Sequence, residues 1–152
     1  MDKDLLRRDL ILKRKSLTSK IVDTKSRKVF ENFKVCDFKK VIKKVLVYLP
    51  INNEINTKLI IEYLKQNKTD MFIPAFINGK WVISEFVNEN ELIAGPFGTR
   101  QPTGSNVAVV DDLDLVIVPG VAFSNNGFRL GYGKGVYDKL LKNFFGIKVG
   151  LA

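Results

Sequence analysis

Residues 115–138 read LVIVPGVAFSNNGFRLGYGKGVYD, and this stretch decides both the fold class and the candidate site. An apolar, β-rich run from Leu113 to Val118 predicts a buried strand, which ends at Pro119-Gly120. A long loop follows to about Gly133, and a helix is expected from Lys134 to Phe144. Ligands of open α/β sheets bind at the carboxyl ends of such strands. The first candidate for a functional site is therefore this loop.

The end of the stretch has the chemistry of a phosphate site. Its alternating glycines are Gly131, Gly133 and Gly135. Glycine permits close backbone approach and positive φ, so successive N–H groups can form an anion-binding nest, and the helix start adds free N–H groups. Arg129 offers a bidentate fork, Lys134 a mobile point charge, and Asp138 a carboxylate suited to Mg²⁺. The alternative is a tight strand-to-helix turn with Lys134 on the surface, since the motif is not a Walker A sequence.

Strands and helices alternate along the rest of the chain. Helices are predicted at residues 2–16, after a Thr18 cap, and from a cap at Asn56 or Thr57 to Lys65. Strands are predicted at 45–49, 71–77, 81–86 and 147–151, with a hairpin turn at Asn78-Gly79. A short helical turn is expected at 88–93 and a loop at 95–105. The pattern predicts a Rossmann-like, three-layer αβα fold whose mostly parallel sheet carries one antiparallel hairpin, residues 72–86.

Length and composition narrow the class of protein. The 152 residues are 45% hydrophobic and 27% charged, which suits one folded domain over residues 1–152. The longest apolar run, broken by Pro119-Gly120, is too short to span a bilayer. The absence of histidine excludes Ser-His-Asp and Cys-His catalysis. The single cysteine, Cys36, forms no intramolecular disulfide, which favours a reducing cytoplasm, and it is expected to be buried.

The positive charge lies in the N-terminal third. The net charge is +9, and residues 1–44 hold 15 basic and 6 acidic side chains, against 10 and 10 in residues 45–152. A basic block binds nucleic acid, a membrane surface or a small polyanion, or is simply a solvated helix face. No zinc-finger, RRM, KH or homeodomain pattern is present, so we expect no nucleic-acid partner.

The residues from Leu115 to Phe123 and from Asn126 to Asp138 resemble the signature of 5-formyltetrahydrofolate cyclo-ligase, also called methenyltetrahydrofolate synthetase. Weaker matches run in order along the chain. They are Lys3 to Arg7 with Arg14 and Leu17-Thr18, Val47 to Thr57, Ile73-Pro74, and Phe97 to Pro102. The resemblance implies ATP-dependent conversion of 5-formyltetrahydrofolate to 5,10-methenyltetrahydrofolate, with Mg²⁺ present and release of ADP and phosphate. That chemistry needs no histidine.

The resemblance also implies roles for individual residues. It assigns ATP contacts to Lys3, Arg7, Arg129, Gly131, Tyr132, Gly133, Lys134 and Gly135. It assigns substrate contacts to Leu49, Glu54 and Tyr137, the metal to Asp138, and catalysis to Lys134, Arg129 and Tyr137. Trp81 and Phe86 are expected to pack the hairpin rather than to stack on the pterin ring.

Three differences from the family pattern keep alternatives open. Val136 stands where the family often has a tyrosine, and Gln101 where many relatives have glutamate. Family members also continue past the Gly150-Leu-Ala152 strand, so we expect this chain to lack their C-terminal tail. The expected protein is a cytoplasmic monomer that acts on a reduced folate and ATP. The alternatives are an inactive relative that binds nucleotide or folate and a basic nucleic-acid-binding protein.

Overall fold

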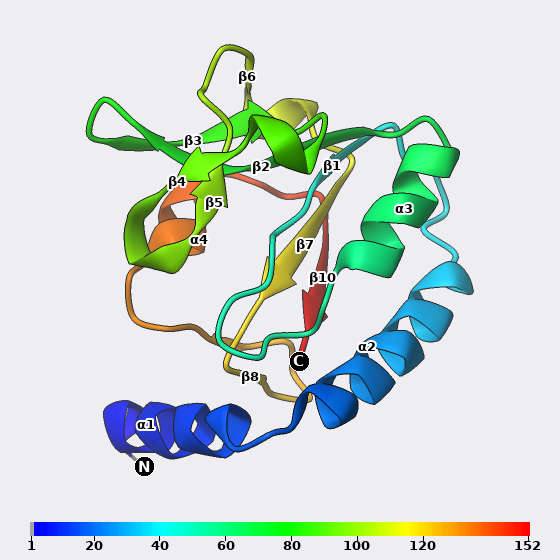
Figure 1. Cartoon of the computed structure of the whole chain (residues 1–152). Coiled ribbons are helices and arrows are strands. Elements are labelled where there is room, and N and C mark those ends of the chain that lie inside the picture. Colours follow the sequence, from blue (N-terminus) through cyan, green and yellow to red (C-terminus); the bar gives the residue numbers. More distant parts are fainter. Residues whose placement is uncertain (1) are drawn as a thin grey trace.

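The computed structural model describes residues 2–152 and has at its centre a six-stranded sheet in the order β10-β7-β1-β2-β3-β6 (Figure 1). The first four strands in this order run parallel, and β3 and β6 are antiparallel to their neighbours. The strands of this sheet are β1 (Lys44–Leu46), β2 (Asp70–Ile77), β3 (Lys80–Glu85), β6 (Val107–Ala108), β7 (Leu115–Pro119) and β10 (Ile147–Leu151). The predicted mixed sheet is confirmed.

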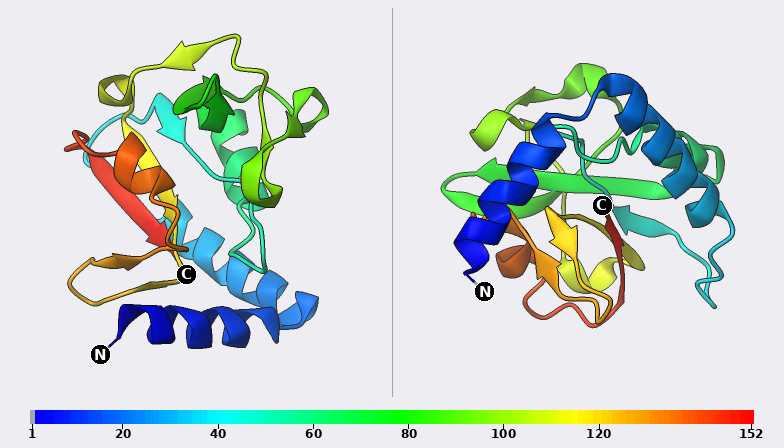
Figure 2. Two further views of the ribbon diagram at one scale, coloured as in Figure 1. Left: turned by 90° about the vertical axis from the view of Figure 1, so that its left-hand side faces the viewer. Right: turned by 90° about the horizontal axis from the view of Figure 1, so that it is seen from below.

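Helices cover both faces of the sheet. The four α-helices are α1 (Lys3–Lys15), α2 (Ser19–Lys34), α3 (Lys58–Gln66) and α4 (Val136–Leu140). Helices α2 and α3 lie on one face and α4 on the other, while α1 crosses below the carboxyl ends of the parallel strands (Figure 2). This arrangement confirms the predicted three layers. Among residues 2–152, no helix has the length and apolar character needed to cross a membrane.

The topology opens a crevice between β1 and β7. These strands are neighbours, but β1 connects through α3 to β2 on one side, whereas β7 connects through α4 to β10 on the other. The two connections therefore leave in opposite directions, which opens a crevice at the carboxyl ends of both strands. The loops that follow Leu46 and Pro119 border this crevice.

The core explains why the parallel strands read as continuous apolar runs. Val45 and Leu46 of β1 and Leu115, Val116 and Ile117 of β7 have no exposed surface. A strand covered by helices on both faces buries every side chain, so its sequence does not alternate. These residues form one cluster with the inward faces of the neighbouring elements.

Local capping fixes the first two helices where the sequence places them. The Asp2 carboxylate accepts a hydrogen bond from the Asp4 N–H at 2.8 Å, and Thr18 Oγ1 accepts one from the Ile21 N–H at 3.3 Å. Both bonds satisfy N–H groups that the first turn of a helix leaves without partners. Helix α1 buries no residue completely, so polar contacts along one face add to the partial packing of its half-buried Leu6, Leu10 and Ile11.

The predicted hairpin of β2 and β3 forms, and the structure adds further antiparallel pairs. Strand β3 also pairs with β6, and two small antiparallel sheets form where the sequence predicted loops or a short helical turn. These sheets pair β4 (Ile93–Ala94) with β5 (Arg100–Gln101) and β8 (Ala122–Phe123) with β9 (Arg129–Leu130). Residues 2–152 also contain 3₁₀ turns at Glu89–Glu91, Pro96–Gly98 and Val110–Asp112. Strands of two residues show no alternation, so the sequence pattern could not reveal them.

Two further expectations were wrong. The helix expected at 134–144 is shortened to Val136–Leu140, because Gly135 at its N-cap adopts φ +66° and Phe144 turns back into the core. A helix of this length has little macrodipole, so it adds less to anion binding than predicted. Cys36 is exposed rather than buried, with its Sγ 3.3 Å from the Asn32 carbonyl oxygen, because it follows the end of α2.

Candidate active site

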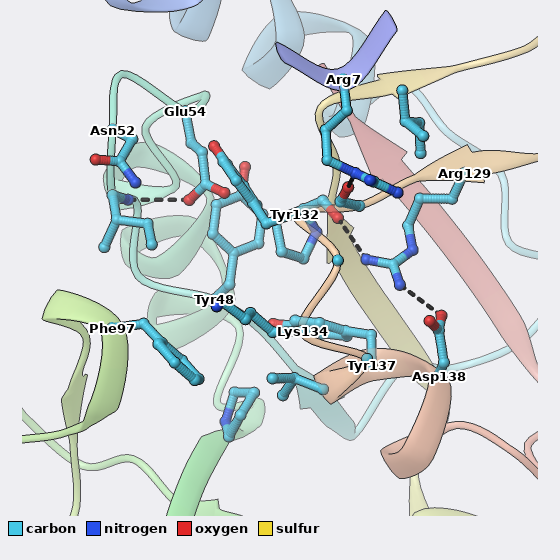
Figure 3. A pocket seen from close by; sticks show the side chains of 18 of the residues that line it. Arg7, Tyr48, Asn52, Glu54, Phe97, Arg129, Tyr132, Lys134, Tyr137 and Asp138 are labelled. Carbon is cyan, nitrogen blue, oxygen red and sulfur yellow. Dashed lines mark hydrogen bonds and ion pairs between the residues drawn. The ribbon is translucent and has the colours of Figure 1, made fainter. Parts of the chain in front are cut away.

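One cavity of about 860 Å³ lies at the crevice between β1 and β7. Every site residue expected from the sequence lines it. These residues are Lys3, Arg7, Leu49, Glu54, Arg129, Gly131, Tyr132, Gly133, Lys134, Gly135, Tyr137 and Asp138. Figure 3 shows Glu54 and Asn52 on one side of this cavity and Arg129 and Asp138 on the other, with Tyr132 between them.

Arg129 is held by three groups at the end of β7. Its guanidinium donates to the Pro119 carbonyl at 3.2 Å and to Asp138 Oδ1 at 2.6 Å, and it lies 5.5 Å from the centre of the Tyr137 ring. Only 19% of the Arg129 side chain is exposed, against 75% for Asp138. Arg129 is therefore a fixed cation, and the Asp138 carboxylate remains open to solvent and to ligands.

The glycine-rich segment lies close to two cationic side chains. Gly133 adopts φ +86°, a conformation that L side chains rarely adopt, and a Cβ there would lie 3.7 Å from the Arg7 guanidinium carbon. A Cβ on Gly131 would lie 3.1 Å from Arg129, closer than an ordinary contact. These positions keep the backbone accessible beside concentrated positive charge, which suits an anionic ligand.

Lys134 reaches across the cavity. Its ammonium lies 5.0 Å from the centre of the Phe97 ring, which belongs to the turn between β4 and β5. Its side chain is exposed and flexible. Lys134 thus links the glycine-rich segment to the opposite wall by a cation–π contact.

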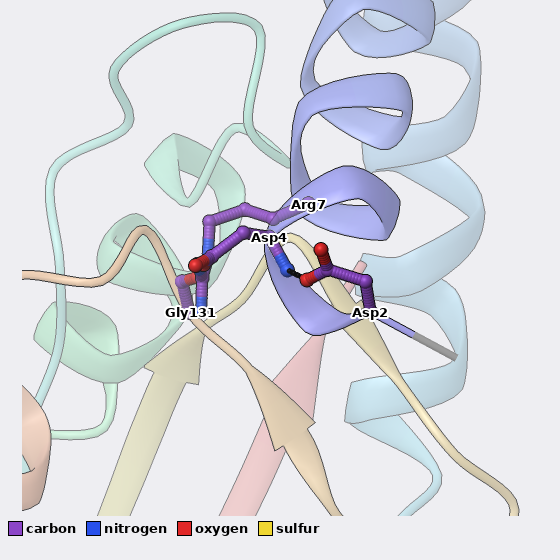
Figure 4. Close-up of polar contacts among 4 residues, drawn as sticks. All are labelled: Asp2, Asp4, Arg7 and Gly131. Carbon is purple, nitrogen blue, oxygen red and sulfur yellow. Dashed lines mark hydrogen bonds and ion pairs between the residues drawn. The ribbon is translucent and has the colours of Figure 1, made fainter.

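Arg7 joins α1 to the glycine-rich segment. Its Nε donates to the Gly131 carbonyl at 2.8 Å, and its Nη1 pairs with Asp4 one turn earlier on the helix (Figure 4). Lys3 lines the same cavity from the same helix. The structure therefore brings the two expected helix cations to the site, but Arg7 already has two partners.

Glu54 is a buried carboxylate with 5% of its surface exposed. Its Oε2 accepts a hydrogen bond from the Ile51 N–H at 2.9 Å, which closes the loop after β1. Burial raises the pKa of Glu54, and the Ile51 N–H, Arg14 and Tyr132 oppose that rise. A buried carboxylate has the chemistry to accept hydrogen bonds from a ligand that brings N–H donors.

Three tyrosines surround the Glu54 side of the cavity. Burial is the largest cause that raises the pKa of Tyr48, Tyr132 and Tyr137, and the nearby Glu54 charge adds to it. The Tyr48 hydroxyl donates to the Ile55 carbonyl at 2.9 Å. Burial moves the pKa of Tyr137 further above its ordinary value, so its hydroxyl is protonated at neutral pH and can donate a hydrogen bond.

Four further residues at or beside the cavity received no site role from the sequence: Arg14, Tyr48, Trp81 and Phe97. Trp81 contacts Phe76 within the hairpin, as expected, but it also stacks on Phe97 with ring centres 6.5 Å apart and lines the cavity. Phe86 is buried and packs in the core. Tyr48 and Phe97 lie in segments that match the family, and Arg14 follows Arg7 by two helical turns and so shares its face of α1, whereas Trp81 had no such signal.

Comparison with known proteins identifies the family of the chain that carries this site. The profile of the 5-formyltetrahydrofolate cyclo-ligase family matches residues 1–150. The chain belongs to this family. A 5-formyltetrahydrofolate cyclo-ligase of Haemophilus influenzae is 30% identical over 118 residues, which cover 72% of this chain and 63% of the relative. A probable cyclo-ligase of Schizosaccharomyces pombe is 30% identical over 84% of this chain and 66% of its own length.

Solved structures of cyclo-ligase relatives share the fold. The 5,10-methenyltetrahydrofolate synthetase of Aquifex aeolicus superposes with a TM-score of 0.86 at 34% identity, covering 100% of this chain and 78% of its own. The 5,10-methenyltetrahydrofolate synthetase of Mycoplasma pneumoniae superposes with a TM-score of 0.77 at 26% identity. The match covers 99% of this chain and 84% of the synthetase. The chain thus spans a little under two thirds of the length of the first two curated relatives.

For this member of the cyclo-ligase family, the donor set limits how a metal could bind. Within residues 2–152, no three acidic or cysteine side chains form a metal cluster. Asp138 is the carboxylate beside the fixed cation, and it is largely exposed. Mg²⁺ commonly binds one or two carboxylates and completes its shell with substrate phosphates and water. Asp138 fits this mode.

Proposed function

We propose that the chain converts 5-formyltetrahydrofolate to 5,10-methenyltetrahydrofolate and cleaves ATP to ADP and phosphate. The observation that supports this most is that one cavity is lined by both a buried carboxylate, Glu54, and a cationic glycine-rich segment. A phosphoryl transfer from nucleotide to folate needs both substrates in one dry cavity with their reacting groups adjacent.

The nucleotide occupies the cationic side in this proposal. Lys3, Arg7 and Arg129 would neutralise its phosphates, and the backbone of residues 131–135 would approach them closely. Lys134 would leave Phe97 and stabilise the charge that develops on the transferred phosphoryl group. Its flexible stem allows that movement.

The folate occupies the other side. Its pterin ring carries N–H groups that Glu54 would accept, with Leu49 packing beside the ring. The protonated Tyr137 hydroxyl would orient the reacting part of the folate, because Tyr137 lies beside Arg129. Trp81 and Phe97 supply an apolar wall opposite.

The chemistry proceeds in two steps. The formyl oxygen on N5 attacks the γ-phosphorus of ATP, the bond to the β–γ bridging oxygen breaks, and ADP leaves. N10 then attacks the carbon of the resulting imidate phosphate and loses its proton, and the carbon–oxygen bond breaks to release phosphate. The protein positions the reactants and neutralises charge in both steps, so no histidine is required.

Asp138 would hold Mg²⁺, which supplies charge neutralisation for the nucleotide phosphates when bound. Arg129 would then exchange its ion pair with Asp138 for a contact to phosphate. We further propose a monomer that acts in the cytoplasm, where both small-molecule substrates are available.

An absorbance assay tests the proposal. The purified 152-residue chain is mixed with ATP, MgCl₂ and 5-formyltetrahydrofolate, and the near-ultraviolet absorbance of the methenyl product is followed. We expect this absorbance to rise only when ATP, MgCl₂ and 5-formyltetrahydrofolate are all present. If the absorbance does not rise with a chain that circular dichroism shows to be folded, the proposal is contradicted. That result favours the alternative that the chain only binds nucleotide or folate.

A further inference from the structure

Arg14 connects both ends of the loop that carries the glycine-rich segment. Its Nη2 donates to the Gly120 and Val121 carbonyls at 2.7 and 3.0 Å, directly after β7. Its Nη1 donates to the Tyr132 hydroxyl at 2.9 Å, inside the glycine-rich segment. One guanidinium thus fixes the beginning and the end of a loop that spans more than ten residues.

The same end of α1 also holds the loop that carries Glu54. The Asn53 side-chain amide donates to the Arg14 carbonyl at 3.2 Å and to the Leu17 carbonyl at 3.1 Å. These bonds satisfy carbonyl groups near the C-terminus of the helix. Asn53 adopts φ +58° and directly precedes Glu54, so its position helps to set that of the carboxylate.

The apolar packing of α1 is only partial. The helix buries no residue completely: Leu5 and Leu12 are 57% and 65% exposed, and Leu6, Leu10 and Ile11 are half-buried. The hydrogen bonds of Arg7 and Arg14 therefore add to this partial packing in attaching α1 to the rest of the molecule. A helix with few fully buried contacts moves as a unit when its polar contacts change.

We propose that Arg14 is a positioning residue that couples the two substrate sites, so that binding of one substrate strengthens binding of the other. The proposal rests on the proposed function, since it assigns the nucleotide to the segment that contains Tyr132 and the folate to Glu54. A nucleotide that orders the glycine-rich segment also fixes Tyr132, and through Arg14 and Asn53 it fixes the Glu54 loop. The folate then binds a loop that is already ordered, and it loses less conformational entropy.

Coupling is measured directly as a ratio of dissociation constants. Isothermal titration calorimetry gives the dissociation constant of a non-hydrolysable ATP analogue with MgCl₂, in the absence and presence of saturating 5-formyltetrahydrofolate. For the unaltered chain we expect the dissociation constant without folate to be about five times or more that with folate. The variants are Arg14→Ala, Arg14→Lys, Tyr132→Phe and the double variant Arg14→Ala/Tyr132→Phe. Arg8→Ala changes an exposed arginine of the same helix and serves as the matched control.

Arg14→Ala is expected to bring the ratio to about one, and Tyr132→Phe to lower it by at least about twofold. Arg14→Lys, which offers one nitrogen where arginine uses two, should give an intermediate ratio. The double variant should match Arg14→Ala, because both changes break one connection. If Arg14 only stabilised the fold, its substitution would lower the unfolding temperature but leave the ratio of dissociation constants of the folded protein unchanged.

The outcomes separate the two proposals. An unaltered chain that binds neither ligand contradicts the proposed function, and the coupling falls with it. An unaltered chain that binds both ligands with a ratio of one overturns the coupling alone. A ratio that survives in Arg14→Ala, or that falls equally in Arg8→Ala, also overturns it and leaves the proposed function standing.

Discussion

At the scale of single residues, Lys134 has a position that no other cation of the cavity shares, because it extends toward Phe97 across the cavity. We predict that Lys134→Ala lowers kcat/KM by at least about tenfold, the effect of losing one charge contact to the transferred phosphoryl group. Steady-state rates from the absorbance assay measure this. Lys139→Ala, an exposed lysine of α4 outside the cavity, should keep the normal rate. Equal rates in the two variants would refute the role of Lys134.

Substitution of Asp138 tests whether this residue holds Mg²⁺, and the quantity measured is the Mg²⁺ dependence of the rate. We predict that Asp138→Asn raises the Mg²⁺ concentration needed for half-maximal rate and lowers turnover by at least about tenfold. The Mg²⁺ dependence is the informative measurement, because the variant also removes the partner of Arg129. Asp112→Asn, at an exposed carboxylate of a 3₁₀ turn, provides the control. An unchanged Mg²⁺ requirement would exclude Asp138 as the ligand.

Glu54 links stability to pH. Burial raises its pKa in the folded state, so the folded protein binds this proton more tightly than the unfolded chain does. The carboxyl therefore costs stability progressively as the pH rises from its ordinary pKa through the raised one. We predict that Glu54→Gln increases the free energy of unfolding at pH 7, with a smaller gain at pH 4, and raises the KM for the folate. Denaturant titrations at both pH values measure the first effect, and an equal gain at both would be inconsistent with the raised pKa.

At the scale of elements, the Asn78-Gly79 turn between β2 and β3 provides a clean test. Gly79 adopts φ +78°, and a Cβ there would meet no atom within 4 Å. We predict that Gly79→Ala destabilises the protein by about 1 kcal/mol through backbone strain alone. Gly79→Asn should cost less, because asparagine tolerates this conformation. Chemical denaturation measures both variants, and a larger loss for the asparagine variant would contradict the strain argument.

Elements with strong periodicity could be predicted from the sequence, and short ones could not. The apolar run of β7 and the Thr18 cap of α2 act locally, so their residues indicate the structure directly. Strands β8 and β9 form a small hairpin of two-residue strands around the Asn126-Gly127 turn, and strands this short carry no alternation that could have revealed them. The site divides in the same way, since the glycine-rich segment is local, whereas Arg14 acts through partners more than 100 residues away.

At the scale of the whole molecule, the topology explains why residues from four separate regions meet. The carboxyl ends of β1 and β7 bring the Glu54 loop beside the glycine-rich segment, and α1 crosses both. The β4–β5 turn adds Phe97 from the opposite wall. We therefore expect this arrangement to let the folate formyl oxygen attack the γ-phosphorus of ATP directly.

Transfer of an oxygen isotope tests whether the formyl oxygen attacks ATP. 5-Formyltetrahydrofolate labelled with ¹⁸O in the formyl group is incubated with the chain, ATP and MgCl₂, and the released phosphate is analysed by mass spectrometry. If the formyl oxygen attacks the γ-phosphorus and leaves with it, each phosphate formed with a methenyl product carries the label. Unlabelled phosphate formed in the same amount as the methenyl product would show that water attacks ATP separately. That result would contradict direct attack by the formyl oxygen.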